Sequence, residues 1–190
     1  MMPTPKSYFE EKYAENDDPW GFRSRAYEKR KYTLTIASLP RSHYQRAFEP
    51  GCSIGVLTKL LAKVSGELIA YEMIPRAACS ARAGTAKLGH VHVEEKSIPD
   101  QWPQGELDLI VLSEIVYYLD EDRVGRLIGR IDDSLAPNGH VVAVHYRGVT
   151  DYPLTGDRAH ELLATSSCLR RVARYEEELF HVDVFERADL

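Results

Sequence analysis

The chain has 190 residues, of which 44% are hydrophobic and 28% are charged, and its formal net charge is −5. This length fits one domain with a single buried core, and the composition is that of an ordinary soluble globular protein. The acidic balance argues against nucleic acid as a partner, since phosphate backbones require basic patches. We also expect no membrane insertion, because no apolar run approaches bilayer length and residues 1–10 lack the apolar core of a signal peptide.

The cysteines indicate the compartment. Cys52, Cys79 and Cys168 are odd in number and show no CxxC spacing. Such cysteines are typical of reduced thiols rather than of a disulfide framework. We therefore expect a cytoplasmic protein, present as a monomer or a weak dimer.

The first forty residues are expected to form a helical unit of their own. Residues 1–20 are polar and aromatic and end in a turn signal at residues 17–20. From residue 24 to residue 39 the sequence favours a helix, with Tyr27, Lys31 and Leu34 on one face, and Pro40 ends it. The pattern predicts that this helix lies across the mouth of a binding site as a lid.

From residue 41 onward, strand and helix signals alternate. The first half of this region predicts a strand near residue 47, a helix from about residue 55, a strand at 68–72, a helix at 75–86 and a short strand at 90–93. Pro75 suits the first turn of its helix because its missing N–H would be unpaired there. Residues 107–112 are almost continuously apolar, which is typical of a central parallel strand buried on both faces.

The second half continues the alternation and then closes with a hairpin. An apolar stripe predicts a helix at 124–135, a turn follows at 137–139, and a strand at 140–146 and a short helix at 157–165 come next. Two β-type runs, 169–175 and 180–187, form the hairpin. The order predicts an α/β fold: a doubly wound, mostly parallel sheet with an antiparallel C-terminal strand. We expect a single domain over residues 1–190, with a lid at 1–40 and a Rossmann-like core at 41–190.

A glycine motif between the first strand and its helix indicates a nucleoside-binding site. The run Glu49-Pro50-Gly51-Cys52-Ser53-Ile54-Gly55 follows a short apolar segment, and the next strand ends in Glu72. This is how an α/β sheet holds the ribose of a nucleoside-like cofactor, although a plain strand-to-helix turn is the alternative. At Gly51 a tight turn needs unusual dihedrals, and a side chain there would collide with the cofactor.

The charge beside the motif distinguishes the cofactors. Glu49 stands just before the first glycine, and a phosphate is a poor guest beside a carboxylate. A cationic sulfonium amino acid is a more favourable ligand beside this carboxylate than a phosphate. The motif therefore indicates S-adenosylmethionine rather than a dinucleotide.

Further candidates follow the fourth and fifth strands, whose carboxyl ends meet at the ligand-binding edge. Ser113 and Glu114 follow the buried strand and are placed to line the methionine part or the acceptor, or Ser113 caps the next helix. His145 ends the fifth strand and either orients or deprotonates an acceptor amine or serves a structural role. Tyr117 and Tyr118 are candidates for stacking on a sugar ring, with core packing favoured for Tyr118.

Aromatic and histidine residues elsewhere in the chain also have both functional and structural interpretations. Trp20 and Tyr27, with Lys31, belong to the lid, and an aromatic face near a sulfonium gains from cation–π attraction; core packing is the alternative. His90 and His92 lie two residues apart on one strand but lack a third ligand, so the sequence predicts no metal site there.

These motifs in this order resemble the class I methyltransferase fold, a Rossmann-like sheet of seven strands, and within it the family of nodulation protein S. The resemblance covers nearly all residues from about Tyr8 onward. It is carried by the runs Asp18-Pro19-Trp20, Tyr27-Glu28, Glu49–Gly55, Trp102-Pro103, Leu107–Glu114 and Val144–Gly148.

The resemblance implies an S-adenosylmethionine-dependent methyltransferase acting on a small acceptor, with N-methylation of an amino sugar or a deacetylated chitooligosaccharide as the expected reaction. It implies S-adenosylhomocysteine as the product of the cofactor. The candidate catalytic residues are Glu114 and His145: one of these two, or a water, is expected to receive the proton that an acceptor ammonium must lose, and the sequence does not choose among them. The residues it implies for cofactor binding are Trp20, Tyr27, Lys31, Glu49, Gly51, Cys52, Ser53, Gly55, Glu72, Met73, Ser97, Ile98, Ser113 and Glu114.

Three positions depart from the commonest methyltransferase pattern. Ser53 stands where glycine is commonest, and Glu72 replaces the more usual aspartate as the ribose acid. After the third strand, Lys96-Ser97-Ile98-Pro99 replaces the stretch that usually offers an aspartate to the adenine. Adenine recognition is therefore expected to rest on the Ser97 side chain and the Ile98 backbone, or on water.

The sequence leaves two alternatives to a methyltransferase. A nicotinamide-dependent oxidoreductase is disfavoured, because Glu49 would face a pyrophosphate and no substrate domain follows the sheet. A non-enzymatic module would bind the nucleoside without catalysis, with the segment Arg23–Lys31 as an exposed docking face.

Overall fold

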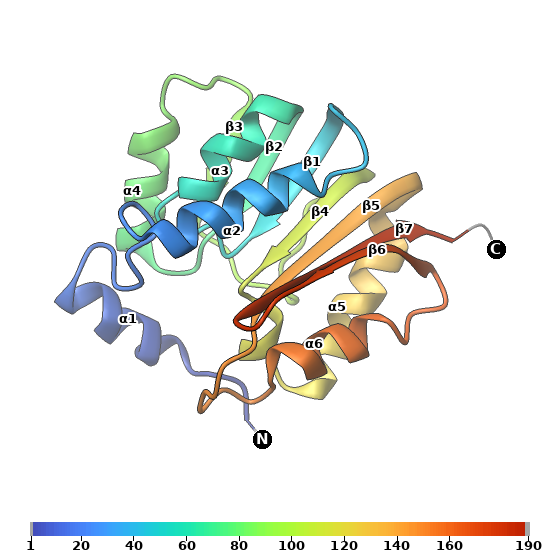
Figure 1. The fold of residues 1–190 in the computed structure, drawn as a ribbon. Coiled ribbons are helices and arrows are strands. Elements are labelled where there is room, and N and C mark those ends of the chain that lie inside the picture. Colours follow the sequence, from blue (N-terminus) through green and yellow to red (C-terminus); the bar gives the residue numbers. More distant parts are fainter. Residues whose placement is uncertain (1, 189–190) are drawn as a thin grey trace.

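The computed structural model describes residues 2–188 (Figure 1). The helices are α1 (Lys6–Glu15), α2 (Ala26–Ala37), α3 (Val56–Leu61), α4 (Pro75–Thr85), α5 (Glu121–Ser134) and α6 (Gly156–Leu163). Short 3₁₀ turns are η1 (Ala62–Val64) and η2 (Val116–Tyr118). The strands are β1 (Tyr44–Pro50), β2 (Ser65–Tyr71), β3 (Val91–Glu94), β4 (Leu107–Ser113), β5 (Leu135–Tyr146), β6 (Leu169–Glu176) and β7 (Phe180–Arg187).

The strands form one seven-stranded sheet in the order β3-β2-β1-β4-β5-β7-β6. Strands β1 to β5 are parallel, and β7 runs antiparallel to both β5 and β6. The predicted α/β class, with a mostly parallel sheet and an antiparallel C-terminal strand, is confirmed. The strand order reverses at β1, which pairs with β2 on one side and with β4 on the other. In an open α/β sheet, this switch point is where ligands bind.

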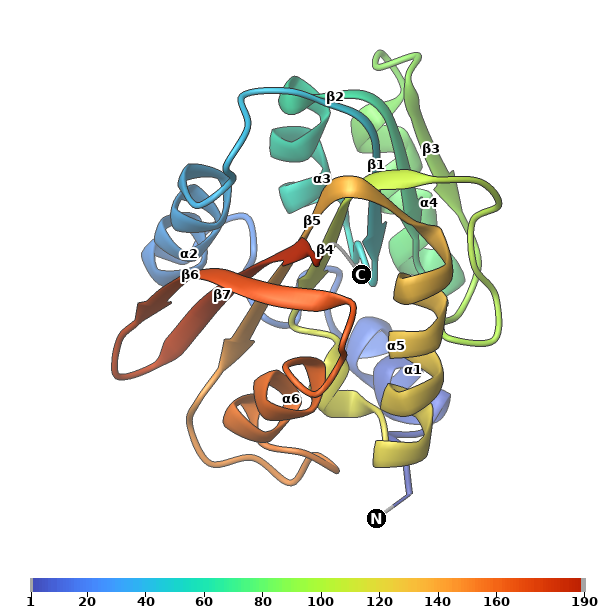
Figure 2. The same ribbon diagram turned by 90° about the vertical axis from the view of Figure 1, so that its right-hand side faces the viewer.

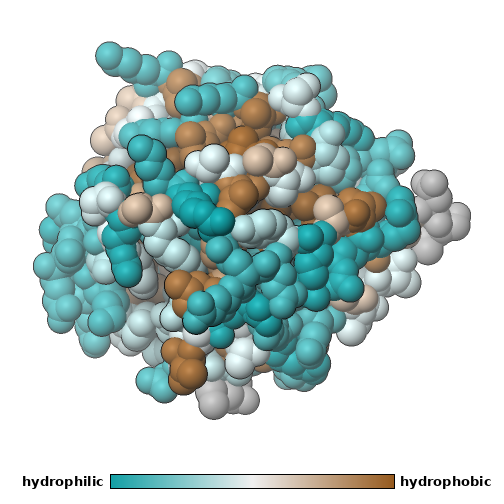
Figure 3. Space-filling view, viewed as in Figure 1, coloured by the Kyte–Doolittle hydropathy of each residue, from teal (hydrophilic) through white to brown (hydrophobic). Residues whose placement is uncertain are grey.

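Helices cover both faces of the sheet because its central strands are apolar on both sides. In β4, Leu109 and Val111 belong to the core shared with α2 and α3. The alternate residues Ile110 and Leu112 belong to the core shared with α5 and α6. This follows from the two-residue period of a strand, and the two helical layers are visible in Figure 2. On the face shown in Figure 3, apolar side chains form only small patches between hydrophilic ones.

Helix α1 was not predicted as a separate element. Its sequence has no apolar stripe, and its only buried side chains are Phe9 and Tyr13. The helix is held by contacts with distant residues: the ring of Phe9 meets Tyr118 edge to face at 4.8 Å, and the Thr4 N–H donates to the Tyr118 carbonyl at 2.9 Å. Long-range aromatic packing therefore determines this helix more than local periodicity does.

The fifth strand begins earlier than predicted. β5 starts at Leu135, directly after α5, so the expected turn at residues 137–139 lies within the strand's bounds. Asn138 has a positive φ of 57° there, and the pairing with β4 shifts register between Leu107 and Leu109. The turn signal thus marks an irregularity in the strand rather than its beginning.

Gly55 forms the junction between the glycine motif and α3. It is the N-cap of α3 with a φ of +77°, and a Cβ added to it would lie 3.0 Å from the Ala81 Cα atom of α4. Glycine is thus required both for the left-handed backbone and for the close packing of α3 on α4. Gly55 serves the fold rather than contacting a ligand.

We expect Gly55→Ala to lower the free energy of unfolding by about 1–3 kcal/mol, because strained backbone and a backbone clash combine. Gly129→Ala in the exposed middle of α5, where a Cβ meets nothing within 4 Å, is the matched control. It should raise the free energy of unfolding by about 0.5–1 kcal/mol. Urea unfolding of both variants checks this, and equal effects would contradict the packing role of Gly55.

Candidate active site

A cavity of about 950 Å³ opens at the carboxyl ends of β1, β2 and β4, at the topological switch point. Its size is in the upper range of small-molecule sites. Residues of α1, α2 and η2 complete the walls. The sequence-predicted site residues that line it are Trp20, Tyr27, Lys31, Glu49, Gly51, Cys52, Ser53, Glu72, Met73, Ser97, Ile98, Ser113 and Glu114. Gly55 and His145 do not line it.

The glycine turn forms one wall with its amide groups already engaged. The N–H groups of Gly51 and Cys52 both donate to the Tyr71 carbonyl, at 2.7 and 2.9 Å. The Ser53 N–H donates to the Glu72 Oε2 atom at 2.9 Å. Ser53 has a φ of 52°, a left-handed conformation that explains why glycine is common at this position. A Cβ on Gly51 would lie 2.8 Å from the Ile115 Cδ1 atom, so this side chain is its closest neighbour.

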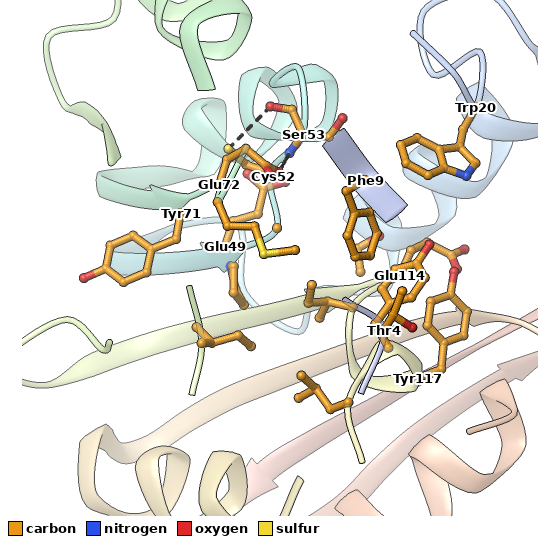
Figure 4. A pocket seen from close by; sticks show the side chains of 18 of the residues that line it. Thr4, Phe9, Trp20, Glu49, Cys52, Ser53, Tyr71, Glu72, Glu114 and Tyr117 are labelled. Carbon is orange, nitrogen blue, oxygen red and sulfur yellow. Dashed lines mark hydrogen bonds between the residues drawn. The ribbon is translucent and has the colours of Figure 1, made fainter. Parts of the chain in front are cut away.

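Glu72 is fixed at the end of β2. Its side chain accepts from the Ser53 N–H through Oε2 and from the Ile74 N–H through Oε1, at 2.9 and 2.8 Å. Burial raises the pKa of Glu72 to about 7, although these backbone donors act in the opposite direction. These two hydrogen bonds hold the carboxylate on the cavity wall, and Figure 4 shows the one from Ser53.

Glu49 is a buried acid of the cavity wall with one unpaired oxygen atom. Only 3% of the residue is exposed, and its Oε2 atom has no hydrogen-bond partner among the described residues. Burial, aided by the charge of Glu72, raises the pKa of Glu49 to about 8. Figure 4 shows Glu49 beside Cys52 and Glu72 at one end of the cavity. A buried carboxylate without a counter-ion favours a cationic guest.

Lys31 lies at the centre of a buried ion cluster. Its Nζ atom is 2.6 Å from the Glu114 Oε1 atom and 2.9 Å from the Glu28 Oε2 atom, and the Lys31 side chain is only 2% exposed. Burial alone would lower the pKa of Lys31, but the two carboxylates raise it, so the amine is charged. The ring of Tyr27 is 5.1 Å from the same amine. The expectation that Arg23–Lys31 is exposed throughout is therefore wrong at Lys31.

Glu114 is oriented from several sides. It has a φ of 57°, and its N–H donates to the Val144 carbonyl at 2.8 Å. Its Oε2 atom accepts from the Tyr117 hydroxyl and from the Tyr146 N–H. Two carboxylates share one lysine here, so the cluster of Glu28, Lys31 and Glu114 carries a net charge of −1 when ionised.

An aromatic wall closes the cavity from the N-terminal side. Trp20 stacks on Phe22 at 5.6 Å and meets Tyr13 at the same centroid distance, and the Tyr13 hydroxyl is hydrogen-bonded to the Ser53 side chain. The Asp18 carboxylate fixes the turn before them by accepting from the Phe22 N–H at 2.7 Å. Sequence reasoning missed Phe9, Tyr13 and Tyr152 in this wall. The spacing of Phe9 and Tyr13 by four residues is the one local signal that could have found them.

The segment expected to contact adenine also lies in the wall. The Ser97 N–H donates to the Gln101 Oε1 atom at 2.9 Å, and the Ser97 hydroxyl is 3.5 Å from the Ile98 carbonyl. Lys96 pairs with Glu94 at 2.7 Å. The loop is thus held by its own residues, with Ile98 and Met73 contributing apolar surface to the cavity.

His145 does not reach the cavity. The residue is fully buried, its Nε2 atom accepts from the Val116 N–H at 3.1 Å, and its Nδ1 atom lies 2.9 Å from the His160 Nε2 atom. Both ring nitrogens are therefore occupied, and burial lowers the pKa of His145 well below its usual value. The expectation that His145 receives a proton from an acceptor is wrong, because the ring lies behind the cavity wall.

Other expectations concern capping, metals and membranes. The N-cap of α5 is Asp120, which accepts from the Arg123 N–H at 2.8 Å, so Ser113 does not cap that helix.

Within residues 2–188, no group of three histidine, cysteine or acidic side chains is arranged to hold a metal ion. No helix in the same range is both long enough and apolar enough to pass through a bilayer.

We expect Lys31→Met to lower the free energy of unfolding at pH 7 by about 3–5 kcal/mol, because two buried carboxylates lose their counter-ion. Lys31 holds down the pKa of the buried Glu28, so without the lysine that pKa rises further and part of the loss is recovered as the pH falls toward 5. Urea titrations at both pH values measure this.

The matched control is Lys29→Met on the exposed side of the same helix, which should change the stability by less than about 0.5 kcal/mol. The double variant Lys31→Met, Glu28→Gln should recover part of the stability at pH 7. A pH-independent loss in the single variant would contradict the charge argument.

The strand order, the glycine turn and the acid-lined cavity at the switch point define the class I methyltransferase fold. The chain belongs to the NodS family: the family model described as nodulation protein S matches residues 5–147.

Individual relatives agree with this assignment. Nodulation protein S of Sinorhizobium fredii is 29% identical over 128 residues, which are 66% of this chain and 59% of that protein. The chain thus spans less than two thirds of this curated relative. A crystal structure of a putative methyltransferase from Pseudomonas syringae is 37% identical, covering 86% of this chain and 100% of that one, with a TM-score of 0.77. N-methyltransferase NodS from Bradyrhizobium japonicum, in complex with S-adenosyl-L-homocysteine, is 25% identical over 96% of this chain and 98% of that one, with a TM-score of 0.87.

Proposed function

We propose that the protein is an S-adenosylmethionine-dependent methyltransferase that N-methylates a small acceptor, an amine on a sugar or on a deacetylated chitooligosaccharide. The observation that carries the cofactor assignment is Glu49, a buried carboxylate on the cavity wall whose Oε2 atom has no hydrogen-bond partner among the described residues. The relative from Bradyrhizobium japonicum holds S-adenosyl-L-homocysteine on the same fold. Its description as an N-methyltransferase supports an amine as the acceptor.

The residues present fit this cofactor better than a dinucleotide. Glu49 offers a negative charge to the cationic amino-acid part, and Glu72 offers acceptors for the ribose hydroxyls. A pyrophosphate needs free backbone N–H groups at the glycine turn. The N–H groups of Gly51, Cys52 and Ser53 are instead taken by the Tyr71 carbonyl and by Glu72. These three donors are therefore not free for phosphate oxygens.

The protein must also prepare the acceptor amine for methyl transfer. When bound, S-adenosylmethionine supplies an electrophilic methyl group on its sulfonium. An amine attacks only through a free lone pair, so an ammonium must first lose a proton. Glu114 is the acid on the β4 edge of the cavity, and its carboxylate attracts the ammonium and receives that proton. Lys31 and the Tyr117 hydroxyl fix the carboxylate's orientation, which is the alignment that such a transfer requires.

The N-terminal residues 1–40 act as a lid in this proposal, because α1 and α2 contribute aromatic and charged side chains to the cavity wall. A cytoplasmic location, and a monomer or weak dimer, stay predictions from the sequence.

We expect the affinity for S-adenosylmethionine to increase between about pH 6 and pH 7, a range in which the ligand's own amino group stays largely charged. The physical reason is that Glu49, with a pKa of about 8, and Glu72, with a pKa of about 7, are largely protonated at the lower pH and must lose their protons to receive a cation and the ribose. Calorimetry in buffers of different ionisation enthalpy measures both the affinity and the protons released.

Glu49→Gln should bind the cofactor more weakly and with a smaller pH dependence. NAD serves as the control ligand and should not bind at any pH in this range. A parent affinity that does not vary with pH, or binding of NAD, would contradict the assignment of the cavity.

We expect Glu114→Gln to reduce kcat by about 10²–10⁴-fold with amino-sugar acceptors, because the amide cannot receive the proton. The affinity for S-adenosylhomocysteine should change far less. Glu28→Gln removes the other carboxylate from Lys31 and is the matched control, whose kcat should be much less affected. Formation of S-adenosylhomocysteine with a panel of amines and alcohols measures the reaction. Cofactor binding without transfer to any amine would refute the N-methyltransferase and support a non-catalytic module.

A further inference from the structure

A chain of buried side chains connects the turn after β4 with the outer pair of strands. The Val116 N–H of η2 donates to the His145 Nε2 atom at 3.1 Å. The His145 Nδ1 atom lies 2.9 Å from His160 Nε2, and the His160 Nδ1 atom lies 2.9 Å from Asp183 Oδ2. All three side chains are at most 1% exposed. The chain therefore runs entirely through the protein interior, from η2 through β5 and α6 to β7.

The direction of each hydrogen bond follows from the first one. A backbone N–H can only donate, so the His145 Nε2 atom carries no proton and its Nδ1 atom carries the proton. The same reasoning places the proton of His160 on Nδ1, from which it is donated to the Asp183 carboxylate. Both histidines are thus neutral Nδ1–H tautomers, and Asp183 is the anion at the end.

The far end of the chain is firmly held. Arg174 on β6 pairs with both oxygens of Asp183, at 2.8 Å through Nε and 3.1 Å through Nη2. Burial of Asp183 acts against its charge, but His160 and Arg174 outweigh it and lower its pKa. His181 packs on the ring of His160 at 3.6 Å. The carboxylate is therefore a fixed acceptor that orients His160 and, through it, His145.

The near end of the chain controls the proposed catalytic turn. Val116 is fully buried and lies between Glu114 and Tyr117, whose hydroxyl holds the Glu114 carboxylate. Glu114 has a positive φ, a conformation that persists only where the surroundings enforce it. The ring of His145 provides this support, because it accepts from the Val116 N–H and meets the Tyr117 ring at 5.1 Å.

We propose that His145 is a positioning residue, which holds the turn at residues 114–117 through its hydrogen bond from the Val116 N–H and is itself oriented by His160 and Asp183. This role rests on the proposed methyl transfer, because the turn carries Glu114. It explains why a histidine ends β5 although it does not line the cavity.

Two substitutions at the same position separate positioning from packing. The amide of His145→Gln reaches where Nε2 lies and can accept from Val116, whereas the amide of His145→Asn reaches where Nδ1 lies and can only meet His160. We expect kcat to fall by about 10²-fold in His145→Asn, while His145→Gln keeps most of it. The KM for S-adenosylmethionine should change little in either.

Both variants remove one buried hydrogen bond, so circular dichroism and thermal unfolding are measured beside the kinetics. His140→Ala is the control for a buried histidine on the same strand that lies away from the turn. It should lose stability but keep its kcat. Equal kcat values in His145→Gln and His145→Asn, or losses that follow the melting temperatures alone, would overturn the proposal.

The protonation states are tested independently of any activity. ¹⁵N spectra of the imidazole groups should show neutral Nδ1–H tautomers for His145 and His160 at neutral pH. A proton on the Nε2 atom of His145 would overturn the proposal. If these tautomers are found but the parent transfers no methyl group, the proposed function fails while the connected chain of side chains stands.

Discussion

A buried carboxylate with one unpaired oxygen atom determines how this cavity can be used. Glu49 is the next-to-last residue of β1, at the switch point, where the carboxyl half of the strand is packed between two helical layers. Leaving a charge in such a place costs free energy unless a ligand compensates it, so in the empty cavity the group binds a proton instead. A permanently charged sulfonium compensates the carboxylate directly. A phosphate would meet the same charge with repulsion, and the amides of the glycine turn are already occupied.

The ionisable groups divide into two sets with opposite dependence on pH. The raised pKa values of Glu49 and Glu72 mean that the folded protein binds more protons than the unfolded chain, so their contribution to stability decreases as the pH rises from about 4.5 through 7 to 8. The histidines behave in the reverse way. The pKa of His181 falls to about 4 by burial, and those of His145 and His160 are also lowered, so their contribution decreases as the pH falls below about 6.5. The cavity and its supporting layer therefore favour different ends of the pH range.

The sequence predicted those features that depend on neighbouring residues. The apolar run of β4 and the stripe of α5 determined their elements, and the spacing of Glu49 and Glu72 around the glycine turn placed both acids at the edge where they lie. Features that depend on distant partners could not be found in this way. Helix α1 is held by aromatic rings from far along the chain, and Lys31 is buried only because Glu114, 83 residues away, meets it. His145 lies in the expected strand, but its ring contacts Val116 and His160 and not the cavity, and neither partner is its neighbour in the sequence.

The two ends of the cavity present negative charge for two different cations. At one end, Glu49 and Glu72 lie at the carboxyl ends of β1 and β2. At the other end, the cluster of Glu28, Lys31 and Glu114 joins α2 to the end of β4. In the proposed reaction, a sulfonium donor and an ammonium acceptor repel each other at the distance needed for methyl transfer, and in a site of low polarity this repulsion is strong. The net charge of −1 in the second cluster reduces it, and the transfer of a proton to Glu114 removes it. Since Lys31 is in α2, the ion pair that orients Glu114 also joins α2 to the end of β4, so this contact couples the position of that helix to the alignment of the proposed proton acceptor.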